Sequence, residues 1–158
     1  MQQIQMIMVA VDFSDYSLPS VQYAHHLAKR LSATLMLVNV FNDRDVRAIQ
    51  NALETYDPKL CQKAIDDRIE ERRVNLQNLE VRAGAQSTVM KRIVRVGVPY
   101  HQLLKAIAEE KPDLLVMGTK GRSNLADTIL GSCAQKMFRR CPIPLLSLRP
   151  GISTEESQ

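Results

Sequence analysis

Short apolar runs alternate with longer amphipathic stretches along this chain, and the alternation predicts an α/β protein. The first run, "IQMIMVAV" from Ile4 to Val11, is expected to form a buried strand. It leads into "DFSDYS", a stretch rich in turn and cap residues, in which Ser17 is the expected N-cap of a helix with Pro19 in its first turn. The apolar residues that recur at helical spacing predict the face of this helix that lies on a sheet: Val21, Ala24, Ala28 and Leu31.

The middle of the chain predicts a second strand and a long helix. The strand is expected from Ala33 to Phe41, and the polar, weakly periodic stretch from Asn42 to about Pro58 is expected to be a mobile connection. The helix that follows is predicted to end near Gly84, a residue typical of helix C-termini. Its buried stripe is predicted to contain Cys61, Ile65, Ile69, Leu76, Leu79 and Ala83.

The third predicted strand and the helix after it occupy the stretch before the most apolar run. Between Met90 and Val96, basic residues are mixed with apolar ones, which favours an edge strand guarded by charge. A helix is expected to begin near Pro99 and to end around Pro112. Its buried residues are predicted to be Leu103, Leu104 and Ile107.

The last third of the chain predicts two more strands with a helix between them. The continuous apolar run "LLVMG", residues 114–118, is typical of a central parallel strand that is covered on both faces. A helix is expected through "SCAQKMFRR", residues 132–140, and a final strand in "IPLLSLR", residues 143–149.

Five strands that alternate with four helical segments predict a parallel α/β sheet, because parallel neighbours need crossover connections. In such sheets, ligands bind outside the carboxyl ends of the strands, at the point where the strand order reverses. If the first and fourth strands are central neighbours, Asp12 and Gly118 both reach this point, and Val40 lies beside it.

Length and composition narrow the class of protein. The chain has 158 residues, 45% of them hydrophobic and 24% charged, which suits one sizeable core. We expect a single domain over residues 1–150 and a short polar tail over 151–158. The first residues resemble no signal peptide and no apolar run is long enough to span a membrane, so a cytoplasmic location is expected. The three cysteines form no CxxC pair and are expected to be free thiols.

The net charge of +4 raises the question of nucleic-acid binding. The basic residues are interleaved with acids, as in "DDRIEERR", and few aromatic side chains are available for base stacking. A solvated, charged helix face explains this pattern better, so no nucleic-acid partner is expected.

The glycine spacing in "GTKGRSNLADTILGS", from Gly118 to Ser132, is the main candidate for chemistry. Glycines at strand ends let a ligand approach the backbone, and Gly131 comes where the next helix begins, at unpaired N–H groups that bind phosphate. Ser132 and Lys120 could add a hydroxyl and a mobile positive charge. The spacing alone leaves open that the glycines only permit tight turns. It matches neither the P-loop nor the dinucleotide-binding GxGxxG motif.

This stretch resembles the G-x2-G-x9-G-[S/T] signature of the ATP-binding branch of the universal stress protein family. "MVAVDFSDYS", "VGVPYHQLLKAIAEEKPDLLVMG" and "SCAQKMFRRCPIPLLSLRP" resemble that family in order and spacing. The resemblance covers about Gln5 to Arg149 and is weakest between Asn42 and Gly84. It implies an open five-stranded parallel sheet of order 3-2-1-4-5 with helices on both faces, a Rossmann-like fold. It also implies a homodimer and bound ATP, ADP or AMP.

The resemblance also implies which residues contact the nucleotide. It assigns the adenosine end to Ala10, Val11 and Asp12, the adenine to the backbone near Val40, and the ribose and base to Met117 and Gly118. The phosphate-binding turn and helix start correspond to Lys120, Gly121, Gly131, Ser132, Cys133 and Ala134. Position 39 holds Asn where many relatives have His, a departure that is expected to concern packing and to leave the motif intact.

Other classes of site find less support in the sequence. A nucleophilic enzyme lacks its GxSxG motif, and His25 and His26 share one helix, so at least one of them must lie off its buried face. His101 is a modest candidate for a site residue. No cluster has metal-ligand spacing, and Mg²⁺ is expected to be held by the nucleotide phosphates. Adenylating enzymes carry loops that "DFSDYS" does not match.

The expected function is therefore that of an ATP-binding sensor or regulator in the stress response, with negligible turnover. A dimeric interaction module that binds no nucleotide and a slow ATP hydrolase remain the alternatives. The expected dimer contact is the last strand, at Leu145 to Leu148, because an apolar edge tends to pair with another chain.

Overall fold

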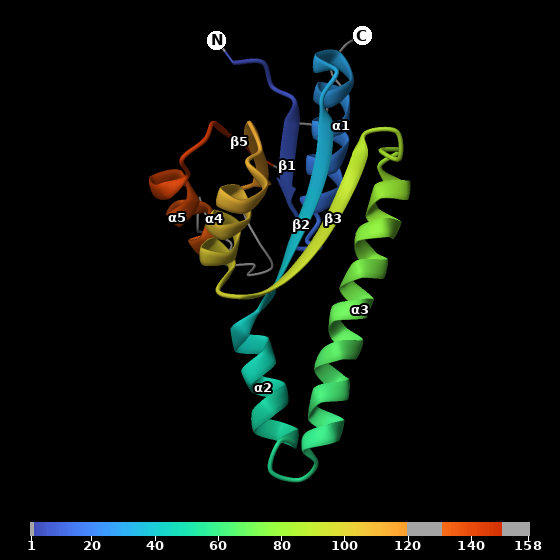
Figure 1. Cartoon of the computed structure of the whole chain (residues 1–158), viewed down its shortest axis with the longest axis vertical. Helices are drawn as coiled ribbons and strands as arrows, with labels where there is room; N and C mark the ends of the chain where they lie inside the picture. Colours follow the sequence, from blue (N-terminus) through green and yellow to red (C-terminus); the bar gives the residue numbers. More distant parts are fainter. Residues whose placement is uncertain (1, 120–130, 150–158) are drawn as a thin grey trace.

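The computed structural model describes residues 2–119 and 131–149. Within these ranges, strands and helices alternate along the chain with one helical hairpin between the second and third strands (Figure 1). The strands are β1 (Met6–Ala10), β2 (Thr34–Asn42), β3 (Val89–Gly97), β4 (Leu114–Gly118) and β5 (Leu145–Leu148). The helices are α1 (Ser17–Leu31), α2 (Asp43–Leu53), α3 (Pro58–Arg82), α4 (Pro99–Glu110) and α5 (Ser132–Arg140).

The five strands form one parallel sheet in the order β3-β2-β1-β4-β5. In the centre of this sheet, Met8 of β1 pairs with Met36 of β2 on one side and with Leu115 of β4 on the other. The predicted fold class and strand order are confirmed. Because β1 and β4 are neighbours, the strand order reverses between them, which is where a ligand crevice is expected.

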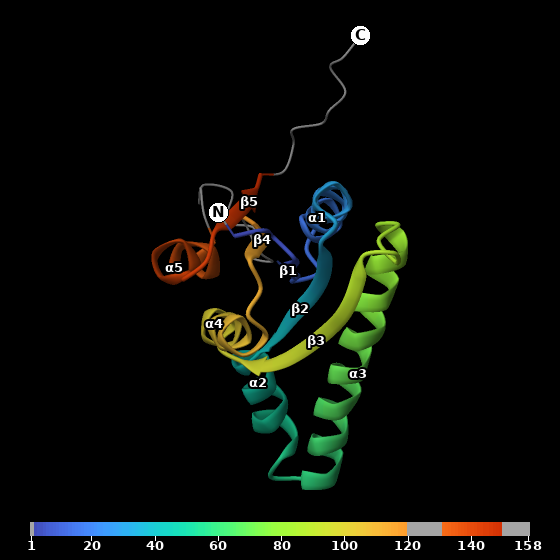
Figure 2. The same cartoon turned by 45° about the horizontal axis from the view of Figure 1, so that its top comes forward.

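The sheet separates two apolar cores, one on each face. Strand residues alternate between the faces, so Ile7 and Val9 pack with α1 and α3, whereas Met8 packs with α4 and α5. Figure 2 shows α1 and α3 on one side of the sheet and α4 and α5 on the other. The helix faces predicted to be buried are largely confirmed, since Val21, Ala24, Ala28, Leu76 and Leu79 are all buried.

The expectation of a mobile connection between Asn42 and Pro58 is wrong, because most of this stretch forms α2. The helix begins where the side chain of Asn42 accepts a hydrogen bond from the Arg44 backbone N–H at 3.0 Å. An ion pair between Asp43 and Arg47, four residues apart, supports its first turns. A helical signal was present in this stretch, because Val46, Ile49 and Leu53 recur at helical spacing.

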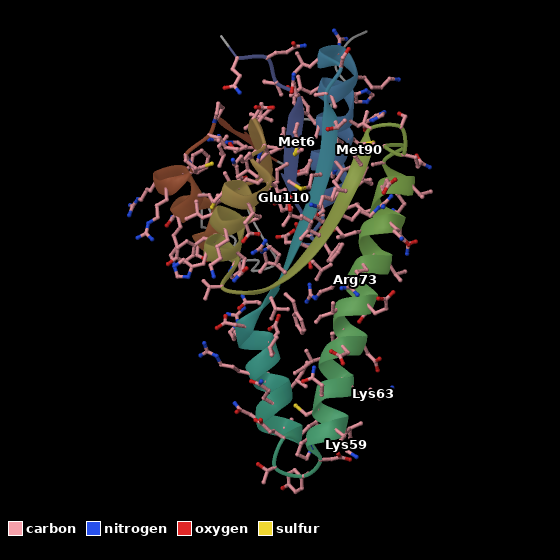
Figure 3. The ribbon with its side chains drawn as sticks, viewed as in Figure 1. Met6, Lys59, Lys63, Arg73, Met90 and Glu110 are labelled. Atoms are coloured by element: carbon pink, nitrogen blue, oxygen red, sulfur yellow. The ribbon has the colours of Figure 1, made fainter. Side chains whose placement is uncertain are left out.

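A helical hairpin, made of α2 and the first half of α3, extends beyond the sheet as an arm (Figure 1). Asp57 caps α3 by accepting hydrogen bonds from the N–H groups of Lys59 and Leu60, and Pro58 occupies the first helical position. Figure 3 shows Lys59 and Lys63 near the tip of this arm, away from the sheet. At the tip, Tyr56 is 87% exposed.

The edge strand β3 is guarded by charge, as its sequence predicted. Lys91 forms an ion pair with Glu110 of α4 at 2.7 Å, and Arg95 pairs with Glu109 at the same distance. On the opposite face, Arg92 pairs with the buried carboxylate of Glu80 on α3. Figure 3 shows Met90 on β3 and Glu110 at the end of α4.

Three finer predictions need correction. The described residues contain five helices where four were expected, because α2 was not foreseen. Ser17 is the first residue of α1 and not its cap, since its hydroxyl donates to Asp12 Oδ1. In α4, Leu104 is only half-buried and Ala106 is buried in addition to Leu103 and Ile107.

The helices range from nine residues in α5 to 25 residues in α3. In the described part of the chain, none combines the length and apolar character needed to cross a membrane.

Candidate functional site

A cleft of about 310 Å³ opens at the carboxyl ends of β1, β2 and β4. The N-terminal ends of α4 and α5 complete it, with Pro99 and Leu103 contributed by α4. Ten residues predicted for the site line this cleft: Ala10, Val11, Asp12, Val40, Met117, Gly118, Gly131, Ser132, Cys133 and Ala134. The other two predicted residues, Lys120 and Gly121, lie outside the described residues.

The turn after β1 places the carboxylate of Asp12 in the cleft. Asp12 Oδ1 accepts hydrogen bonds from the Ser14 backbone N–H at 3.0 Å and from the Ser17 hydroxyl at 3.1 Å. Phe13 between them has φ of 61°, in the left-handed region that bulky residues avoid. Such strain persists where surrounding contacts hold the backbone, so this turn is well fixed.

A partly buried chain of hydrogen bonds supports this turn. Asn39 of β2 is only 2% exposed, and its Nδ2 donates to the Val11 carbonyl at 2.7 Å. Arg72 of α3 donates from Nη1 to Asn39 Oδ1 at 3.1 Å, and its guanidinium lies 4.4 Å from the centre of the Phe41 ring. Both Asn39 and Arg72 line the cleft. Val11, Asp12, Asn39, Val40 and Arg72 form what we call the β1–β2 wall.

Arg72 was not predicted to belong to the site, and Asn39 was expected to concern packing only. A signal for Arg72 was present, because it lies three residues after Ile69 and four before Leu76 on the predicted buried stripe of α3. A charged residue on a buried stripe requires a partner. The identity of that partner depends on how α3 crosses β2.

The opposite side of the cleft is built from backbone. Gly131 is the N-cap of α5, with φ of −66° and ψ of 158°, and among the described residues no side chain accepts a hydrogen bond at this cap. The first N–H groups of a helix have no partner within it and lie at the positive end of its dipole. Gly118 and residues 131–134 form what we call the α5 wall, which suits an anionic ligand group.

Cys133 in the α5 wall is not a reactive thiolate. Its pKa is raised to about 11, mainly by burial and also by the charge of Asp12, while Lys136 opposes the rise. A thiol with such a pKa stays protonated at neutral pH and is a poor nucleophile. Cys133 therefore contributes an apolar, half-buried surface to the cleft.

The start of α2 adds polar groups that sequence analysis also missed. Asn42, Arg44 and Asp45 line the cleft beside the end of β2. They were missed because this stretch was expected to be a mobile connection. The arm thus contributes to the wall of the cleft through Arg44 and Asp45 of α2.

The histidines lie elsewhere. His25 is buried in α1, where its Nδ1 lies 2.8 Å from the Thr88 hydroxyl, whereas His26 and His101 are exposed. The prediction that one of the paired histidines lies off the buried face is confirmed. Among residues 2–119 and 131–149, no group of three or more His, Cys, Asp or Glu side chains could hold a metal ion.

Comparisons with known proteins agree with this architecture. The chain is 28% identical over 144 residues to the universal stress protein YxiE of Bacillus subtilis, covering 90% of this chain and 97% of that protein. Its fold matches the solved structure of MJ0577, a universal stress protein of Methanocaldococcus jannaschii, with a TM-score of 0.79 and 18% identity over 96% of this chain and all of that one. It also matches a universal stress protein solved in complex with cAMP, with a TM-score of 0.61 and 25% identity over 94% of this chain and 98% of that one.

The family assignment rests on a match to most of the chain. The model of the universal stress protein family matches residues 3–149, which include every described strand and helix. The chain therefore belongs to the universal stress protein family.

Proposed function

We propose that the cleft binds an adenine nucleotide, ATP foremost, and that the protein acts as a nucleotide sensor or regulator in the stress response. The observation that carries the proposal is the contrast across one cleft. A wall fixed by side-chain hydrogen bonds faces a helix N-terminus whose cap residue has no side chain. A nucleotide has the matching two ends, a nucleoside and an anionic phosphate group.

The phosphates are proposed to lie at the α5 wall. Its N–H groups and the Ser132 hydroxyl are donors, and the helix dipole favours negative charge there. The first turn, Ser132 to Ala134, carries no acid that would repel a phosphate. Lys120 and Gly121 belong to the same proposed phosphate site, although they lie outside the described residues.

The nucleoside is proposed to lie at the β1–β2 wall. Ala10, Val11 and Val40 offer apolar surface and backbone groups, Asp12 offers a carboxylate to the ribose, and Met117 forms an apolar floor. The relative solved with cAMP supports this ligand class, because cAMP is an adenine nucleotide with one phosphate. Any Mg²⁺ is proposed to be held by the phosphates themselves, since this ion keeps several waters and needs few protein ligands.

Calorimetric titration tests the proposal. ATP, ADP, AMP, cAMP and adenosine are titrated into the purified protein, with GTP as the control for the base. Binding of adenine nucleotides that strengthens with phosphate number is the expected result. The mass of any small molecule released on denaturation gives an independent check. A protein that binds none of these ligands would instead be a nucleotide-independent interaction module.

We further propose that ATP is bound and kept. A dedicated ATPase positions a water molecule and offsets developing charge with metal ions and cationic groups. The α5 wall offers backbone donors for binding, and its one thiol is held protonated. A single-turnover measurement with labelled ATP and Mg²⁺ is expected to show negligible hydrolysis, whereas a rate of about one per second would identify an enzyme.

The proposed assembly is a homodimer through β5. This short strand lies at the edge of the sheet, and all four of its residues are only half-buried. The other edge, β3, carries lysine and arginine side chains that pair with glutamates. An apolar edge without such charges is suited to pairing with a second copy.

A further inference from the structure

We propose that Arg72 is a positioning residue for the nucleotide site, acting through Asn39 on the turn that carries Asp12. This inference rests on the proposed function, because it assigns the turn to the nucleoside end of a bound nucleotide. It assigns to the α3 helix a part in binding that no residue on that helix was predicted to have.

The chemistry of the hydrogen-bond chain permits only one arrangement. The Val11 carbonyl can only accept a hydrogen bond, and the Arg72 guanidinium can only donate. Asn39 lies between them, so its Nδ2 must face Val11, at 2.7 Å, and its Oδ1 must face Arg72, at 3.1 Å. The guanidinium therefore locks the orientation of the Asn39 amide.

The amide in turn holds the end of β1. Val11 is bound twice to β2, since its N–H donates to the Val38 carbonyl at 2.8 Å and its carbonyl accepts from Asn39. The next two residues are Asp12, whose carboxylate lines the cleft, and Phe13, with its left-handed backbone. A strained turn stays in place only if its neighbours hold it, and Asn39 holds the residue immediately before Asp12.

Arg72 is itself held in a defined position. Its guanidinium lies 4.4 Å from the centre of the Phe41 ring, and the Phe41 side chain is only 2% exposed. The planar group lies over the ring while donating to Asn39, a combination that lysine does not reproduce. The side chain thus spans from α3 to β2, and its effect reaches β1 through one amide.

Four variants test the inference. R72M removes the charge and the donor, whereas R72K keeps the charge and loses the planar fork. N39D keeps an acceptor for Arg72 and nearly the same volume, but it removes the donor to Val11. R73M is the matched control, because Arg73 is the next residue on α3 (Figure 3), its side chain is 62% exposed, and it pairs only loosely with Glu70 at 3.3 Å.

Each variant is titrated with adenosine and with ATP, and its backbone amide chemical shifts are recorded without ligand. R72M and N39D are expected to weaken the binding of both ligands by the same factor, about tenfold, the order of effect of losing one hydrogen bond. R72K is expected to show most of this loss of affinity, whereas R73M is expected to bind both ligands as tightly as the wild type. The amide shifts of Asp12 and Phe13 are expected to move in R72M and N39D and to stay in R73M.

Several results would overturn the inference. R72K with wild-type affinity would show that Arg72 acts by charge alone. If R72M lowers the affinity for ATP by a larger factor than the affinity for adenosine, Arg72 acts on the phosphates. Unchanged affinity in R72M and N39D would remove any role in binding.

Failure of the proposed function gives a different result. In that case the wild-type protein binds neither adenosine nor ATP, and the amide shifts decide about Arg72 separately. Shifts of Asp12 and Phe13 that do not respond to R72M would overturn the positioning role. Shifts that respond would support it as a property of the free protein.

Discussion

The two walls of the cleft are made in different ways. The β1–β2 wall is held by side chains, because Asp12 accepts from Ser14 and Ser17 and Asn39 joins Val11 to Arg72. The α5 wall is made from backbone, with Gly131 as a cap residue that has no side chain. One wall is held in place by side-chain hydrogen bonds within the protein, whereas the other presents backbone donors to the cleft.

This difference indicates how substitutions in the cleft should behave. A wall fixed by internal hydrogen bonds couples binding to stability, so a change there affects every ligand and the fold as well. In a wall of open backbone donors, binding does not depend on hydrogen bonds that stabilise the fold. A change there should therefore affect only ligands with an anionic group. The contrast extends to the sheet edges, since β3 lies beyond the first wall and β5 beyond the second.

The largest expected effect is that of Gly131→Asp. A carboxylate at the cap would accept hydrogen bonds from the N–H groups of α5 and would repel phosphate. Unit charges about 4 Å apart interact by about 4 kcal/mol at intermediate dielectric. We expect ATP affinity to fall by more than about 100-fold, while the far-ultraviolet circular dichroism spectrum stays unchanged. The backbone of Gly131 has φ of −66°, which any residue adopts, so no strain is introduced.

Gly131→Asn is the matched control for the charge. Asparagine caps the helix with the same shape but without the negative charge, so its loss of ATP affinity should be much smaller. Calorimetric titration with ATP and adenosine separates the two contributions. Undiminished ATP affinity in Gly131→Asp would contradict the assignment of phosphate to the α5 wall.

The next effect concerns the two edges of the sheet. Glutamate in place of Leu148 on β5 is expected to convert the proposed dimer to a monomer, because it puts a charge in an apolar contact. Glutamate in place of Val96 on β3, which is 41% exposed, is the control at the other edge and should leave assembly unchanged. Light scattering measures both, and a wild-type protein that is already a monomer would refute the dimer.

A smaller effect is expected for Asp12→Ala in the β1–β2 wall. It removes the acceptor for the Ser14 N–H and the Ser17 hydroxyl, so the free energy of unfolding should fall by about 1–2 kcal/mol. Affinities for adenosine and ATP should fall together, by about tenfold. Asp12→Asn keeps an acceptor oxygen and should retain most of the stability in urea unfolding. If Asp12→Ala lowered the affinity for ATP but not for adenosine, the result would contradict the proposed difference between the two walls.

The smallest effect is a pH dependence of the free energy of unfolding that arises from His25, which is buried on α1 outside both walls of the cleft. Burial lowers its pKa below the ordinary 6.5, and the nearby charges of His26 and Lys29 lower it further. The unfolded chain then binds the proton more readily, so stability falls as the pH drops below about 6.5 towards the folded pKa. Thr88 donates its hydroxyl proton to the Ala85 carbonyl and therefore accepts from the neutral imidazole at Nδ1.

Urea unfolding of the wild type and of His25→Gln at pH 7.5 and pH 5.5 measures this effect. The wild type should lose more stability between the two values than the variant, whose side chain does not titrate. Equal losses would mean that other groups account for the acid sensitivity.

Local patterns in the sequence predicted most of the fold. The apolar runs at β1, β2 and β4 and the helical stripes of α1 and α3 are set by side-chain spacing, which repeats within a few residues. The charged edge β3 and the helix end near Gly84, which has φ of 64°, were also visible locally. Missing from the prediction was α2, whose first turns are supported by a cap and an ion pair, although Val46, Ile49 and Leu53 recur at helical spacing in it.

In the candidate site, too, some residues were predicted from local sequence patterns, whereas others are brought together only by the tertiary structure. Asp12, Gly118 and Gly131 each follow or precede a recognisable element, and the strand order brings them to one crevice. The sequence by itself therefore determined the α5 wall and the place of the cleft. The link from Arg72 through Asn39 to Val11 joins residues 33 and 28 positions apart. Only the tertiary structure decided it, because a hydrogen bond of 2.7–3.1 Å depends on the crossing of α3 over β2 and on the sheet register, and spacing along the chain encodes neither.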